Sequence, residues 1–305
     1  MRIIKSAEIG RAEVEKLLQK KSFDEINLAA TETVRKIVAD VRNFGDRAVI
    51  DYTKKFDGVE LTAENFQVTE DEFIAAEHVA DKKIIESLKR AAENIFSYHR
   101  EQIPKSWITY RGENSILGQS IIALDRVGVY VPGGTAAYPS SVLMNVIPAK
   151  VAGVREIIMC VPAKNKINPY VLIAAKIAGA DKIFKIGGAQ AIAAMAFGTE
   201  TIPRVNKITG PGNIFVTLAK KEVYGHCDID MLAGPSEILI IADSSANPIY
   251  AAADMLSQAE HDKLACSILI TTDENLAEKI FAEVELQLNN LERKDIAEQS
   301  IKNNG

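Results

Sequence analysis

Apolar residues recur every three or four positions over the first hundred residues, which is typical of amphipathic helices. Between residues 27 and 56 this repeat is broken only at Gly45, after which Asp46 is placed to cap a second helix. A further helical pattern runs over residues 70–103 and stops before Pro104, whose ring disfavours helical geometry in the preceding residue. The chain is therefore expected to open with helices.

After Pro104 the pattern changes to strands. Residues 106–110 and 115–124 alternate apolar with polar side chains around the segment 111–114, which predicts a β-hairpin. From Asp125 onward, short apolar segments alternate with helical ones. Strands are expected over residues 127–131, 156–161, 183–186, 205–208, 237–242 and 265–271, and helices over residues 140–152, 168–178, 189–197, 212–224, 248–261 and 274–291. This alternation predicts an α/β fold in which helices cover both faces of parallel sheets.

Composition and charge narrow the class of protein. The 305 residues are 47% hydrophobic and carry a net charge of −5, with lysine and arginine spread along the chain, so no basic surface for nucleic acid or for an anionic membrane is expected. The apolar segments are too short to cross a bilayer. Three cysteines without a CxxC pair are typical of a reducing compartment. We therefore expect a cytoplasmic protein with no nucleic-acid or membrane partner.

Three glycine-rich turns follow predicted strands, at residues 130–134, 187–190 and 210–213. Ligands of open α/β sheets bind where strands end, and glycine lets the backbone approach a phosphate there. None of the three turns matches the GxGxxG fingerprint of dinucleotide-binding folds. For any one of them, a tight structural loop is the simpler interpretation.

Gln258 and His261 are three residues apart near the end of a predicted helix, and so share one face of it. Histidine is a common zinc ligand, whereas an amide oxygen is an unusual one. A capped helix end surrounded by solvated charges explains the same pattern.

Two of the three cysteines, Cys160 and Cys266, lie in buried-strand patterns and are interpreted as core residues. Cys227 follows His226 and suggests a thiolate nucleophile with an adjacent base. Neighbouring residues of an extended segment point to opposite faces, which argues against that dyad.

Taken together, several long segments resemble the histidinol dehydrogenase family, in family order and along most of the chain. They are residues 41–46 (VRNFGD) with 55–57 (KFD), 127–134, 187–199, 209–213 (TGPGN), 229–237 (IDMLAGPSE) and 256–262 (LSQAEHD). The resemblance implies a zinc-dependent enzyme of histidine biosynthesis that oxidises L-histidinol to L-histidine through histidinal and reduces two NAD molecules. It also implies a homodimer.

The resemblance assigns roles to individual residues. It implies that Tyr130, Gln190 and Asn213 bind NAD and that Ser236 contacts the substrate. Gln258 and His261 become zinc ligands that also face L-histidinol. The family's Glu-His base and its two remaining zinc ligands match no segment of these 305 residues, so no catalytic base is expected here, and weak zinc binding with weak or absent turnover is expected.

The implied architecture consists of two incomplete Rossmann-like parallel-sheet domains, one inserted in the other. An N-terminal helical arm would span residues 1–24. The first domain would comprise residues 25–128 and 236–305 and would be truncated, and the inserted NAD-binding domain would span residues 129–235. Two alternatives stay open: an aldehyde dehydrogenase that uses Cys227, and a non-catalytic fragment or binding module.

Overall fold

The structure, a computed structural model, describes residues 2–5, 10, 12, 15, 28–62, 64–133, 138–162, 166–234 and 236–305. Its contacts divide the chain into two units, Asn27–Leu232 on the one hand and Met1–Ile26 with Ala233–Gly305 on the other. The division predicted from the family resemblance groups residues 25–128 with 236–305 instead, and it stays a prediction. The predicted N-terminal arm, residues 1–24, lies largely outside the described residues.

Five parallel strands form the sheet of the Asn27–Leu232 unit, in the order β5-β4-β3-β6-β7. They are β3 (Arg126–Tyr130), β4 (Glu156–Cys160), β5 (Lys182–Phe184), β6 (Lys207–Thr209) and β7 (Asp228–Ile229). β3 comes first in the chain and lies in the middle, because β4 and β5 are added on one side of it and β6 and β7 on the other. The two-residue strand β7 was not expected, since it is too short to show periodicity.

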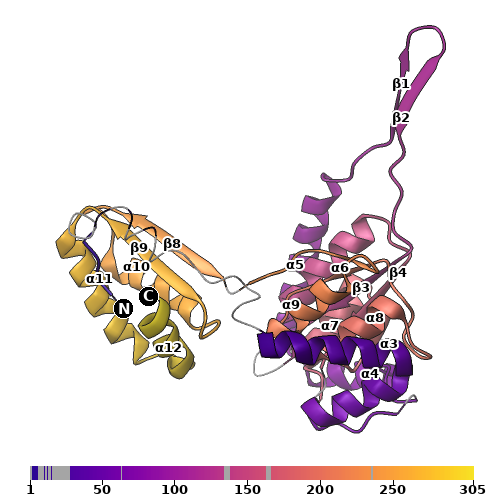
Figure 1. Ribbon diagram of the computed structural model, residues 1–305, viewed down its shortest axis with the longest axis horizontal. Coiled ribbons are helices and arrows are strands. Elements are labelled where there is room, and N and C mark those ends of the chain that lie inside the picture. Colours follow the sequence, from indigo (N-terminus) through magenta and orange to yellow (C-terminus); the bar gives the residue numbers. More distant parts are fainter. Residues whose placement is uncertain are drawn as a thin grey trace. The chain divides into compact units, whose positions relative to one another are not determined.

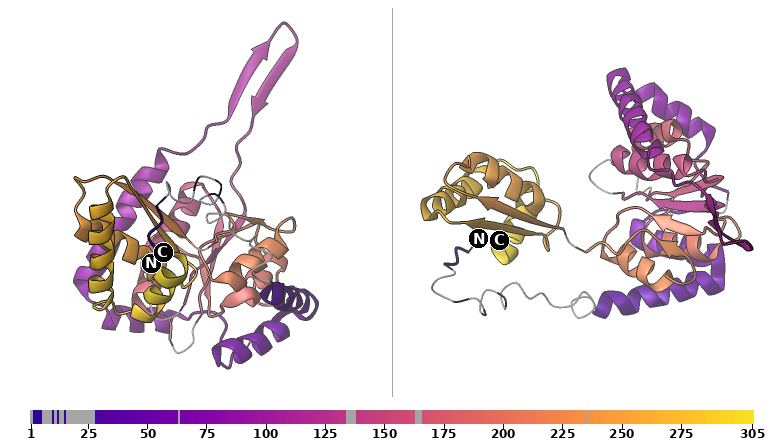
Figure 2. Two further views of the ribbon diagram at one scale, coloured as in Figure 1. Left: turned by 60° about the vertical axis from the view of Figure 1, so that its left-hand side comes forward. Right: turned by 90° about the horizontal axis from the view of Figure 1, so that it is seen from above.

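Helices cover both faces of this sheet (Figure 2). One layer contains α4 (Glu70–Val79), α5 (Lys82–Arg100), α6 (Pro139–Val151) and α7 (Pro169–Ala178), and the other contains α3 (Leu28–Asp57), α8 (Gly188–Phe197) and α9 (Ile214–Val223). In β3 the alternation of side chains is visible directly: Val127 and Val129 pack into the core under the first layer, while Gly128 lies against Met195 of α8. The predicted α/β fold is confirmed.

The break that the sequence predicts in the first helix is a kink at Gly45, which has φ 53° and ψ −134°. The carboxylate of Glu200 accepts a hydrogen bond from the backbone N–H of Asp46 at 2.8 Å. The carboxylate of Asp46 in turn accepts one from the hydroxyl of Thr201 at 2.5 Å. The kink is thus held by the loop after α8, from a part of the chain more than 150 residues away.

The helical pattern over residues 70–103 was predicted as one helix, and this prediction is wrong. The structure has two helices, α4 and α5, because Ala80 adopts an extended conformation and Asp81 caps α5 by accepting a hydrogen bond from Lys83 N at 2.8 Å. Ala80 thus ends the first helix, and Asp81 begins the second, since its side chain satisfies a backbone N–H that the helix leaves unpaired.

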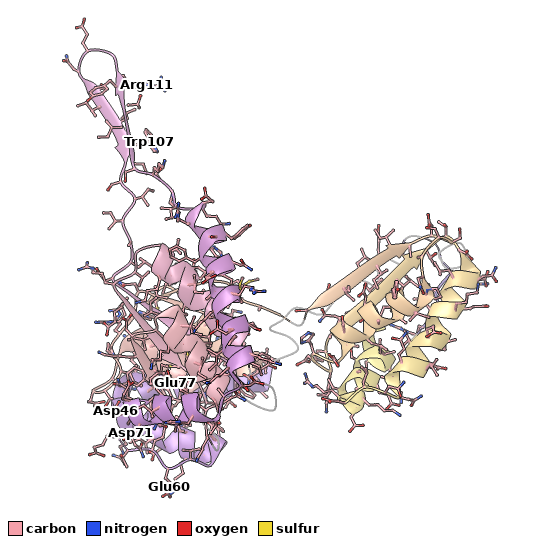
Figure 3. The ribbon with its side chains drawn as sticks, turned by 180° about the vertical axis from the view of Figure 1, so that it is seen from behind. Asp46, Glu60, Asp71, Glu77, Trp107 and Arg111 are labelled. Carbon is pink, nitrogen blue, oxygen red and sulfur yellow. The ribbon has the colours of Figure 1, made fainter. Side chains whose placement is uncertain are left out.

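The predicted hairpin is present as β1 (Trp107–Arg111) and β2 (Ser115–Gln119), with Tyr110 opposite Ile116. It projects away from the sheet and helices of its unit (Figures 1 and 3). All of its strand residues are exposed except Thr109, which is half-buried.

The second unit contains a parallel pair of strands, β8 (Glu237–Ala242) and β9 (Cys266–Thr271). Three helices pack on it: α10 (Pro248–Ala259), α11 (Glu274–Leu288) and α12 (Lys294–Asn304). Ile240 and Leu269 pack towards these helices, whereas Leu239, Ile241 and Ile270 are exposed. No helix in the described part of the chain has the length and apolar character needed to cross a membrane.

Candidate functional site

The strand order of the sheet reverses between β3 and β6: β4 and β5 lie on one side of β3, and β6 and β7 lie on the other. β3 and β6 are neighbours although they are far apart in the chain. In open α/β sheets, ligands bind outside the carboxyl ends of the strands at such a switch point. Tyr130 is the last residue of β3, and the turn of residues 210–213 directly follows β6. Two of the segments predicted to bind a nucleotide therefore meet at this edge of the sheet.

Tyr130 connects this edge to the start of α8. Its side chain is buried, and its hydroxyl accepts a hydrogen bond from the backbone N–H of Gly188 at 3.1 Å. Burial raises the pKa of the Tyr130 phenol to about 12. Gln190, two residues further along α8, is 2% exposed, and its side chain lies close against Gly188. Tyr130 and Gln190, two of the three predicted NAD-binding residues, thus both contact Gly188.

Asn213, the third of them, is the N-cap of α9. Its side-chain oxygen accepts hydrogen bonds from Phe215 N at 3.1 Å and from Val216 N at 3.2 Å. This role explains why an asparagine ends the glycine-rich turn, since asparagine is among the residues that best satisfy the unpaired N–H groups of a helix start. The residue itself is exposed at the edge of the sheet.

In each of the three turns, one glycine is required by contacts within the protein. A Cβ atom at Gly210, which has φ 115°, would lie 2.0 Å from the backbone oxygen of Tyr130. At Gly187 and Gly133 a Cβ atom would lie 2.2 and 2.8 Å from the ring of Pro162. These glycines therefore have a cause nearer than approach to a phosphate: two of the turns pack against Pro162, and the third packs against the end of β3.

Three further polar residues at this edge escaped sequence reasoning. The hydroxyl of Thr209, at the end of β6, is buried and has no hydrogen-bond partner among the residues that the structure describes. Lys220 of α9 is buried and forms an ion pair with Asp230, at 2.7 Å. Thr209 and Asp230 stand in segments that resemble the family, whereas no local pattern in the sequence singles out Lys220.

Ser236, Gln258 and His261 belong to the other unit, where they lie near the beginnings of β8 and β9. Ser236 precedes β8, and its backbone oxygen accepts a hydrogen bond from Cys266 N at 3.3 Å. The helix predicted to end at about residue 261 ends at Ala259, so His261 lies in the following turn, where its N–H donates to Gln258 O at 3.2 Å. Because α10 returns the chain to this end of the strand pair, all three residues share it.

The chemistry of Gln258 and His261 fits part of a zinc site. The Nε2 atom of Gln258 is buried without a hydrogen-bond partner among the described residues, while His261 is exposed. Amide oxygen and nitrogen atoms exchange places when the amide group rotates by half a turn, so this buried position is equally that of a ligating oxygen. Nowhere in the described ranges do three or more His, Cys, Asp or Glu side chains form a group able to hold a metal. The pair by itself offers two donors, fewer than the four that zinc usually takes, and its role as a metal ligand pair stays a prediction.

The environment of Cys227 argues against a thiolate nucleophile. Cys227 is buried, its Sγ donates to Val205 O at 3.5 Å, and burial raises the pKa of its thiol to about 11. The ring of His226 lies against the ring of Phe197, with centroids 5.4 Å apart. Burial also raises the pKa of the Cys160 thiol. A thiol with a raised pKa is protonated at neutral pH and is a poor nucleophile.

Comparison with known proteins decides the family. Residues 19–305 match the family model for histidinol dehydrogenase. The chain belongs to the histidinol dehydrogenase family. It is 50% identical to the histidinol dehydrogenase of Clostridium acetobutylicum over 307 aligned positions, which cover 99% of this chain and 71% of that protein. It is 56% identical to the histidinol dehydrogenase of Aquifex aeolicus over 274 positions, which cover 90% of this chain and 63% of that protein.

A solved member of the family has the same fold. The crystal structure of histidinol dehydrogenase from Elizabethkingia anophelis superposes with a TM-score of 0.84 at 41% identity, over 95% of this chain and 67% of that one. The chain thus spans about two thirds of the length of the family members it matches. The roles assigned to Tyr130, Gln190, Asn213, Ser236, Gln258 and His261 stay predictions.

Proposed function

We propose that this chain takes part in the zinc-dependent oxidation of L-histidinol to L-histidine, through histidinal and with reduction of two NAD molecules, as the last steps of histidine biosynthesis. The observation that carries the proposal is the family match over residues 19–305. The segments 130–133 and 210–213 meet at the switch point of the sheet, and Gly188 of the third segment donates a hydrogen bond to Tyr130. This arrangement supports the proposal, because such sheets bind nucleotides at the switch point.

In this proposal the Asn27–Leu232 unit binds NAD through Tyr130, Gln190 and Asn213. The strand order of its sheet, with the first strand in the middle, supports a Rossmann-like arrangement. The finer division, two incomplete Rossmann-like domains with residues 129–235 inserted in the first, is part of the proposal.

The Ala233–Gly305 part would hold zinc and substrate. Gln258 and His261 would be metal ligands, and Ser236 would contact L-histidinol. When bound by these residues, zinc would supply a Lewis-acidic anchor that helps to position the substrate for oxidation. The buried, unpartnered amide atom of Gln258 supports a ligand at this position. We further propose that the protein acts in the cytoplasm and as a homodimer, as the family resemblance implies.

The test has a binding part and a turnover part. NADH formation from L-histidinol with added zinc would be followed at 340 nm, first with this chain alone and then with a polypeptide that carries the part of the relatives it does not match. Turnover in the mixture supports the proposal, and turnover by the chain alone contradicts the expectation that it lacks the catalytic base. If neither the chain nor the mixture oxidises L-histidinol or binds NAD, the proposal fails and a non-catalytic binding module is favoured.

Zinc binding would be measured separately, by competition with a chromophoric chelator. Gln258→Ala and His261→Asn are each expected to weaken it by about tenfold or more, whereas His226→Asn, which removes a histidine far along the chain from the predicted ligands, serves as the control. Equal zinc affinity in all three variants would remove the metal assignment without affecting the NAD assignment.

A further inference from the structure

An ion pair between the buried Lys220 and the partly exposed Asp230 binds the backbone of Gly210. Lys220 Nζ donates to Gly210 O at 2.5 Å and to Asp230 Oδ1 at 2.7 Å. Asp230 Oδ2 accepts from Gly210 N at 2.8 Å, and Oδ1 also accepts from Met231 N at 2.7 Å. Both polar groups of Gly210 are therefore bound by the same pair of side chains.

Burying the charged side chain of Lys220 costs free energy, which indicates that the ion pair has a specific role. The side chain of Lys220 is only 5% exposed and that of Asp230 29% exposed. Removing two charges from water often costs as much as their attraction returns, so an apolar pair of similar volume would hold α9 in place equally well. An apolar pair would leave Gly210 N–H and C=O without these partners.

The backbone of Gly210 has little room to move. Its φ of 115° is one that other residues rarely adopt, and the backbone oxygen of Tyr130 leaves no room on its Cβ side. The turn runs from the buried hydroxyl of Thr209 to the helix cap at Asn213. The ion pair on one side and the end of β3 on the other thus fix the path of this turn.

We infer that Lys220 and Asp230 are positioning residues for nucleotide binding: they hold the 209–213 turn in the geometry that accepts NAD. This inference rests on the proposed NAD-binding function and adds two residues that act through the backbone of Gly210. It predicts that removing the pair weakens NAD binding even in a variant that folds normally.

The test uses the double variant Lys220→Met/Asp230→Asn. Asp230→Asn alone would leave the charge of Lys220 buried without its ion-pair partner and is expected to destabilise the unit strongly. The double variant removes both charges and is expected to fold with a melting temperature near that of the wild type. The control is Lys207→Met/Asp228→Asn, which removes a neighbouring ion pair of 2.6 Å whose side chains are 31% and 54% exposed.

The decisive readouts are NAD affinity by titration calorimetry and hydrogen exchange of the backbone amides of residues 210, 212 and 213. The folded double variant is expected to bind NAD about tenfold or more weakly and to exchange these amides faster, while the control variant matches the wild type. In an assembly that turns over L-histidinol, KM for NAD should rise while KM for L-histidinol stays unchanged.

A folded double variant with wild-type NAD affinity and wild-type exchange would overturn the inference and leave the pair a purely structural role. If the wild-type chain itself does not bind NAD, the proposed function fails. Hydrogen exchange then decides alone whether the pair fixes the turn, and unchanged exchange overturns that part as well.

Discussion

The hydroxyl of Tyr130 accepts a hydrogen bond from the backbone N–H of Gly188, at 3.1 Å, and so ties the end of β3 to the first turn of α8. Tyr130→Phe would leave that N–H without its partner at a buried position. We expect a loss of about 1–3 kcal/mol in the free energy of unfolding, measured by urea denaturation. Tyr110→Phe, on the exposed hairpin, is the control and is expected to change stability little. Equal effects of the two variants would contradict the role of this hydrogen bond.

The same tyrosine makes stability depend on alkaline pH. Burial raises the pKa of Tyr130 to about 12 in the folded chain, above the ordinary value of about 10. Between these values the unfolded chain releases the phenolic proton and the folded chain keeps it, so unfolding becomes more favourable as pH rises. The contribution, roughly 2–3 kcal/mol, is fully present below pH 10 and is lost on the way to pH 12. Unfolding curves at a series of pH values should show a shallower loss for Tyr130→Phe than for the wild type.

The variants Gly210→Ala and Gly225→Ala distinguish the stability cost of a strained backbone conformation from the cost of a steric clash. Both glycines have a positive φ, 115° and 98°. A Cβ atom at Gly210 would lie 2.0 Å from the backbone oxygen of Tyr130, whereas one at Gly225 would have no atom of the described residues within 4 Å. Gly225→Ala should cost about 1–2 kcal/mol from backbone strain alone. Gly210→Ala should cost several kcal/mol or prevent folding, because the turn must move away from β3. Similar melting temperatures for the two variants would contradict this packing.

The raised pKa of the Cys227 thiol, about 11, predicts slow chemistry at that residue. At pH 7.5 iodoacetamide should modify Cys227 far more slowly in the folded chain than in urea, since only the thiolate reacts. Modification would be followed by peptide mass spectrometry. Cys227→Ser should leave NAD binding unchanged. Rapid labelling, or loss of L-histidinol oxidation by the mixture when this chain carries Cys227→Ser, would contradict this expectation and indicate a reactive thiolate at Cys227.

Thr53 is 1% exposed, and its hydroxyl has no hydrogen-bond partner among the residues described by the structure. Replacing it with the nearly isosteric valine removes an unpaired polar group from the core, so Thr53→Val should raise the free energy of unfolding by about 1 kcal/mol. The control is Thr33→Val on the same helix, where an exposed hydroxyl donates to Ala29 O at 3.0 Å. A destabilised Thr53→Val variant would show that the hydroxyl is satisfied in solution.

Local pattern was enough to predict much of this fold. The alternation of short apolar segments with helical ones places β3 to β6, β8, β9 and the helices between them, because each element shows its own periodicity over several residues. The break at Gly45 and the hairpin before Asp125 are likewise visible in the sequence, since a glycine and an alternating pair of segments are local signals. The family resemblance depends on long segments such as 209–213 and 229–237, and the comparisons confirm it.

Only the tertiary structure decided what those segments contact. The strand order, which brings the end of β3 beside the end of β6, depends on pairing between residues about 80 positions apart and leaves no trace in periodicity. For the same reason no local pattern shows that Lys220 is buried against Asp230 and Gly210. The residue types were readable from the chain, but burial, hydrogen-bond partners and pKa shifts are set by what the fold places around a side chain.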